Sequence, residues 1–116
     1  MNPGDAESFD SDVREEDVHD NVERELRRVT DRLQTMPLTR LETTTSAVYS
    51  CAQALVIAGR ELGVPIPDDA QLPDLRPQAY GDLIAVLGRD CLDAAGKDAD
   101  LLPVHDSLTA LRRVLP

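Results

Sequence analysis

The chain has 116 residues, of which 41% are hydrophobic and 29% charged, and its formal net charge is −10. A chain of this length and composition is large enough to bury one hydrophobic core, so we expect a single globular domain. Its negative charge is repelled by nucleic-acid phosphates and by anionic lipid, which argues against direct binding to nucleic acid or to a membrane.

The negative charge is concentrated at the N-terminus. Residues 1–20 hold eight acidic side chains and one Arg, a net of −7, whereas residues 21–116 hold fourteen acidic and eleven basic side chains, a net of −3. Residues 1–12 are polar and acidic, so we predict a disordered tail there and a helical bundle domain over residues 13–116. The tail lacks the apolar run of a signal peptide, and we expect a cytoplasmic protein. Eleven Arg against one Lys are typical of a GC-rich bacterial genome.

The first periodic segment predicts a helix over about 13–35. Its apolar side chains recur every three or four residues, and the positions between them are mostly charged, which is typical of one buried stripe on a solvated helix. The stripe consists of Val18, Val22, Leu26, Val29, Leu33 and Met36. Pro37 ends the pattern, because proline disfavours the helical conformation in the residue before it.

The most apolar stretch, residues 47–59, lies within the second predicted helix, about 40–62. The sequence TRLE at 39–42 has the form of a capping box, and Gly63 predicts a left-handed cap at the other end. Apolar side chains cover most of this helix, so we expect it at the centre of the bundle, with a narrow polar strip that also carries Ile57. The stretch is shorter than the roughly 20 residues that a membrane-spanning helix needs.

The hydroxyl cluster TTTS, at residues 43–46, lies in a helix rather than in a glycine-rich loop, and no Lys follows it. We therefore expect the hydroxyls of Thr44 and Thr45 to bond back to carbonyl groups one turn earlier rather than to bind phosphate.

Three prolines in residues 63–76 predict an irregular strap. Helices are expected over about 77–95 and 101–115, each with an Asp before a proline in its first turn. The sequence thus predicts an all-α, single-domain bundle of four roughly antiparallel helices with a proline-rich strap between the second and third. The short gap between the first two helices predicts an antiparallel hairpin.

A stripe of small residues, Gly81, Ala85 and Gly88, lies on the third predicted helix. It has two interpretations: close packing against another helix, or a crevice for a small ligand. For the first, the second helix offers a matching surface of small residues, namely Ala54, Ala58 and Gly59.

Residues that carry chemistry are few. His19 lies between Glu15 and Glu23 on one helix face, where the three could meet a cation, although metal sites usually draw ligands from more than one element. His105 is expected to be an exposed first-turn residue. Cys51 and Cys91 lack metal or redox spacing and are predicted to be buried, reduced thiols. We expect no catalytic residue, no cofactor and no metal.

Three functional hypotheses remain open. The first is a small non-enzymatic module for protein–protein interaction or dimerisation, with Ile57, Val64, Ile66 and Leu72 as the candidate partner-binding residues. The second is an acidic regulator whose N-terminal segment mimics nucleic-acid phosphate and binds a basic partner protein. The third is a small metal-binding protein or enzyme, which depends on His19.

Overall fold

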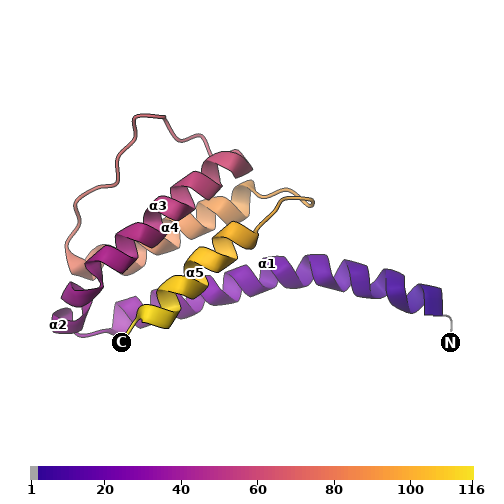
Figure 1. Cartoon of the computed structure of the whole chain (residues 1–116), viewed down its shortest axis with the longest axis horizontal. Helices are drawn as coiled ribbons and strands as arrows, with labels where there is room; N and C mark the ends of the chain where they lie inside the picture. The colour runs from indigo at the N-terminus through magenta and orange to yellow at the C-terminus, as the bar shows by residue number, and fades with distance from the viewer. Residues whose placement is uncertain (1–2) are drawn as a thin grey trace.

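A computed structural model describes residues 3–116, with side chains from Val18 onward. The described chain forms helices and contains no strand, which confirms the all-α bundle with an irregular strap over residues 63–76 (Figure 1). The elements in chain order are α1 (Pro3–Thr35), α2 (Leu38–Leu41), the 3-10 turn η1 (Glu42–Thr44), α3 (Thr45–Leu62), the 3-10 turn η2 (Pro77–Ala79), α4 (Tyr80–Ala94) and α5 (Leu102–Val114).

The first helix begins earlier than predicted. The sequence suggested a helix over 13–35 after a disordered tail, whereas α1 begins at Pro3. Proline is well tolerated in a first helical turn, and the acidic residues that follow favour the positive end of the helix dipole. The N-terminal half of α1 extends away from the other helices (Figure 1). Residues 1–2 lie outside the described chain, and the division into a tail and a bundle domain stays a prediction.

The second predicted helix is divided into α2, η1 and α3. Helix α2 begins at Leu38, directly after Pro37, and no side chain caps its N-terminus. The capping box predicted for residues 39–42 is therefore wrong. Pro37 has extended backbone angles, φ −61° and ψ 149°, from which the helix starts at once, so that Thr39 lies inside the helix instead of at its cap.

Two other local features of this segment are confirmed. The Thr44 hydroxyl donates to the carbonyl oxygen of Leu41 (2.6 Å), and the Thr45 hydroxyl donates to that of Glu42 (3.3 Å). Gly63 ends α3 with φ 103°, a left-handed conformation that glycine adopts without steric cost. Both features depend only on neighbouring residues, which explains why the sequence sufficed to predict them.

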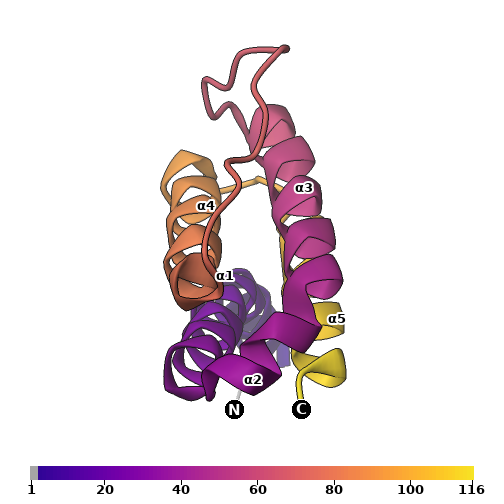
Figure 2. The ribbon, with the colours of Figure 1, turned by 90° about the vertical axis from the view of Figure 1, so that its left-hand side faces the viewer.

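The four long helices lie at the corners of the bundle in cross-section (Figure 2). Helix α1 packs against α4 and α5, and α3 packs against the same two helices, so α1 and α3 occupy opposite corners. The antiparallel hairpin predicted for the first two helices is therefore wrong. The short α2 and η1 carry the chain across the end of the bundle, and α3 starts from the far corner (Figure 2).

Helices α3 and α4 run parallel, which also differs from the roughly antiparallel bundle expected. At their starts the hydroxyls of Thr45 and Tyr80 are 2.8 Å apart, and further along both helices the Cys91 thiol donates to the Leu55 carbonyl oxygen at 3.4 Å. The strap makes this possible, because it returns along the length of the bundle before α4 begins (Figure 1). Such a long crossover is a known connection in four-helix bundles.

The core is built from the apolar faces that periodicity predicted. Val18 is an exception, because it is 45% exposed. Leu92 on α4 is buried as well. The fully buried side chains at the centre include Val22, Val29, Leu33, Val48, Leu55, Ile84, Val104 and Leu108.

The small-residue stripe on α4 packs against a helix. A Cβ placed on Gly88 would lie 2.5 Å from Leu26 Cδ1, and one placed on Gly81 would lie 2.8 Å from Gln34 Cγ. Two glycines therefore let α4 approach closely, and the crevice interpretation is wrong at these positions. The helix that they meet is α1, and not the surface of α3 suggested by Ala54, Ala58 and Gly59.

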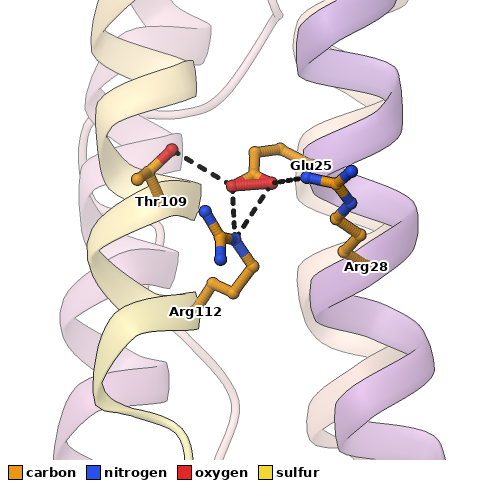
Figure 3. Close-up of polar contacts among 4 residues, drawn as sticks. All are labelled: Glu25, Arg28, Thr109 and Arg112. Atoms are coloured by element: carbon orange, nitrogen blue, oxygen red, sulfur yellow. Dashed lines mark hydrogen bonds and ion pairs between the residues drawn. The ribbon is translucent and has the colours of Figure 1, made fainter.

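A buried carboxylate joins α1 to α5 (Figure 3). Glu25 is only 4% exposed, and its oxygens accept from Arg112 Nε at 2.5 and 3.1 Å and from the Thr109 hydroxyl at 3.4 Å. Arg28 lies on the same helix as Glu25, and its Nη1 is 3.6 Å from Glu25 Oε2. The sequence did not single out Glu25, because a charged position beside an apolar stripe is usually exposed.

Candidate functional site

An open groove of about 850 Å³ lies between the strap, α3 and α4. Each of these three elements contributes apolar side chains to its walls, among them Val56, Ile57, Ile66, Leu72, Leu83 and Leu87. We call it the strap groove. The strap runs beside the parallel helices α3 and α4 (Figure 2), and residues of all three elements line the groove.

Three of the four candidate partner-binding residues line the strap groove. Ile57 is 59% exposed, and Ile66 and Leu72 are partly buried. Val64 is also partly buried but packs beside Gly59, where an added Cβ would lie 3.4 Å from its Cγ2. Residues from two distant parts of the chain therefore meet at one surface, and Val64 supports the strap next to it.

Two side chains of α3 hold the strap. The Tyr49 hydroxyl donates to the carbonyl oxygen of Pro73 (2.7 Å) and accepts from the amide of Leu75 (2.9 Å). About three turns further along α3, Arg60 Nη2 donates to the carbonyl oxygen of Pro67 (2.7 Å). The Tyr49 ring also packs edge-on against Tyr80, with ring centroids 5.8 Å apart. The strap is thus fixed at both ends of the groove.

The sequence did not identify Tyr49 and Arg60 as anchors. The pattern of this segment predicted a largely apolar helix with a narrow polar strip, and no contact for either side chain. One signal in the sequence pointed to the Tyr49 contact. A buried Tyr usually needs a hydrogen-bond partner for its hydroxyl, and the proline-rich segment that follows α3 offers free backbone groups.

The edges of the strap groove are mainly acidic. Arg60, Asp74 and Asp90 line the groove, and Asp68 and Asp69 are exposed on the strap beside it. Across residues 60–100 there are nine acidic and four basic side chains. Arg60 is bonded to the strap, although its Nε is buried without a hydrogen-bond partner. The groove therefore combines apolar walls with a net negative edge.

The histidines lie at another cavity, between α1 and the loop that joins α4 to α5. His19 and His105 both line this space of about 1060 Å³, although the sequence treated them separately. Ligand atoms of His19, Asp20 and Glu23 lie within 4.8 Å of one another. Glu15, the other residue of the predicted cluster, has no described side chain.

One member of this cluster is already bound to another side chain. Glu23 Oε1 accepts from Arg89 Nη1 at 2.9 Å, and this hydrogen bond holds the pKa of the Glu23 carboxyl below its ordinary value. The three residues come from one face of a single helix and are at least partly exposed, whereas metal sites usually enclose the ion. The geometry therefore favours the strap groove over the histidine cluster as the functional site.

Both cysteines are buried and free, as predicted. Burial raises the pKa of Cys51 to about 12 and that of Cys91 to about 11, the latter with a contribution from neighbouring Asp90. A thiolate is the reactive form of cysteine, so neither residue has the environment of a nucleophile.

No helix within residues 3–116 combines the length and the apolar character needed to cross a bilayer. Comparisons with family models, with characterised proteins and with solved structures find no match to this chain. The functional interpretation therefore depends on the geometry of the strap groove.

Proposed function

We propose that the protein is a small, non-enzymatic, cytoplasmic interaction module that binds a partner protein in the strap groove. One observation carries the proposal: an exposed isoleucine, Ile57, stands at an apolar groove formed by α3, α4 and a fixed strap. Binding pockets on proteins are typically concave and mostly apolar, with a few polar groups that set orientation.

The energetics of the groove support binding. Ile57 is 59% exposed, and burial of that exposed part by a partner contributes about 1–2 kcal/mol, which approaches the size of an interface hot spot. The strap is held at both ends by Tyr49 and Arg60, and it contains several prolines. Less conformational entropy is therefore lost when a partner binds against it.

The test compares two exposed apolar residues. The full chain, carrying Ile57→Asp or Val114→Asp, is used to capture proteins from the lysate of its own cells at low and high salt. Val114 is 64% exposed on α5, which contributes no residue to the groove, so the second variant adds the same charge elsewhere. We expect Ile57→Asp to lose a protein that the unchanged chain and Val114→Asp both retain. Identical capture by all three would refute the proposal.

A second candidate, the acidic regulator, is supported by a different observation. Residues 1–20 carry a net charge of −7, and the N-terminal half of α1 extends beyond the other helices (Figure 1). A basic partner bound there would be lost when residues 1–12 are deleted and would dissociate as salt is raised. The Ile57→Asp variant would retain that partner, which separates the two hypotheses.

A further inference from the structure

We infer that the segment recognised by the strap groove is a cationic peptide of a partner protein, with one or two apolar anchor side chains flanked by Lys or Arg. This inference rests on the proposed function of the groove and adds the chemistry of the partner.

The charge around the groove is the first argument. Asp74 and Asp90 line it and are exposed, and Asp68 and Asp69 stand on the strap beside Ala70, another lining residue. The one cation among the lining residues, Arg60, donates to the strap carbonyl of Pro67. An acidic or neutral segment would leave these carboxylates without a counter-charge, whereas Lys or Arg beside the anchor would pair with them.

The apolar walls of the groove are the reason to expect an apolar anchor side chain in the peptide. Val56, Leu83 and Leu87 provide apolar surface on two helices, and Ile57 stands exposed beside them. A side chain such as Leu or Phe removes this surface from water. We expect the anchor to set the lifetime of the complex, and the flanking charges to set its rate of formation and its dependence on salt.

A second copy of this chain is a poorer occupant. Each copy carries a formal net charge of −10 and would bring an equally acidic groove edge to a symmetric interface. Several of its arginines are already paired within the molecule: Arg112 and Arg28 with Glu25, and Arg89 with Glu23. Like charges facing each other across an interface oppose association.

The experiment selects short random peptides displayed on phage. The full chain is the bait, and peptides that also bind the Ile57→Asp variant are removed. We expect the retained peptides to share one or two large apolar residues flanked by Lys or Arg. Synthetic copies should bind at least tenfold more weakly at about 0.5 M than at about 0.05 M NaCl, because salt screens the charged pairs at the edge.

Two double variants test the carboxylates directly. Asp74→Asn with Asp90→Asn should weaken binding of the selected peptide by about three- to tenfold, as expected for two exposed ion pairs. The control, Asp31→Asn with Asp106→Asn, changes net charge equally at exposed positions of α1 and α5 that do not line the groove, and should leave affinity unchanged.

The outcomes separate the inference from the proposed function. If the retained peptides are acidic or uncharged, the groove binds peptides but the inferred partner is wrong. If no peptide distinguishes the chain from Ile57→Asp, the proposed function itself fails. If sedimentation shows a dimer that Ile57→Asp dissociates, the occupant is a second copy and the inference is overturned.

Discussion

The carboxylate of Glu25 is almost completely buried between α1 and α5. Its carboxylate depends on Arg112, because Thr109 and Arg28 lie further away (Figure 3). A buried charge that loses its partner keeps its desolvation cost without the compensating attraction. The stability of the α1–α5 interface should therefore depend on the side chain at position 112.

Replacement of Arg112 tests this interface. We expect Arg112→Leu to lower the free energy of unfolding by about 1–3 kcal/mol, because the buried carboxylate then lacks its closest donor. The neighbouring Arg113 is exposed, and Arg113→Leu should change stability by no more than about 0.5 kcal/mol. Denaturant titration measures the free energy of unfolding of both variants. Equal losses would mean that the Glu25–Arg112 contact does not stabilise the fold.

The two cysteines give a prediction for pH. Their pKa values are raised to about 12 for Cys51 and about 11 for Cys91, from an ordinary value of 9.0, so both thiols stay protonated in the folded protein well above pH 9. The unfolded chain ionises them near pH 9, so stability from this source is complete below pH 9 and is lost as pH rises toward 11–12.

Thiol labelling checks this prediction. A water-soluble thiol reagent should react slowly with the native protein at pH 8 and rapidly once denaturant is added, and replacing both cysteines with Ala should reduce the loss of stability above pH 9. Rapid labelling without denaturant would show that at least one thiol is accessible.

Among the elements, the strap is held in place by hydrogen bonds from two side chains of α3, Tyr49 and Arg60. Tyr49→Phe removes the hydroxyl that bonds to Pro73 and Leu75, while the ring that packs on Tyr80 remains. We expect faster hydrogen exchange at the Leu75 amide and weaker peptide binding in the groove, with exchange in the middle of α3 unchanged. The control is Tyr80→Phe, which removes only the contact with Thr45. If both variants leave the Leu75 amide equally protected, Tyr49 is not the anchor.

The helices themselves show which elements can be predicted from local sequence. The buried side chains of the last helix and its C-terminal cap recur every three or four residues: Val104, Leu108, Leu111 and Leu115. Spacing alone suffices there, because a helix places every third or fourth residue on one face. The capping box at residues 39–42 failed because Pro37 provided a competing start for the same helix.

At the scale of the whole molecule, the long α1 divides into a part that packs in the bundle and a part that extends beyond it (Figure 1). Deletion of residues 1–12 should shift the thermal midpoint by less than about 2 °C, because the apolar stripe of α1 that enters the core begins further along the chain. Calorimetry measures this shift. A loss of several degrees would mean that the predicted tail contributes to the folded domain.

The features that depend only on neighbouring residues could be predicted from the sequence. These are the helical periods, the left-handed end of α3 at Gly63, the buried thiols and the irregular strap. The same reasoning proposed Ile57, Val64, Ile66 and Leu72 as partner-binding residues, because apolar residues on a polar strip or in a proline-rich segment have no place in a helical stripe. Three of them, Ile57, Ile66 and Leu72, line the groove.

Which surfaces meet could be seen only in the tertiary structure. It placed α3 parallel to α4, matched Gly88 with Leu26 on α1, and paired Glu25 with Arg112, which is 87 residues further along the chain. It also made a groove from the strap residues and Ile57 by anchoring the strap on Tyr49 and Arg60. The physical reason is that periodicity shows which side of a helix avoids water, but any apolar neighbour satisfies that requirement; the choice among neighbours depends on packing and hydrogen bonds between distant residues.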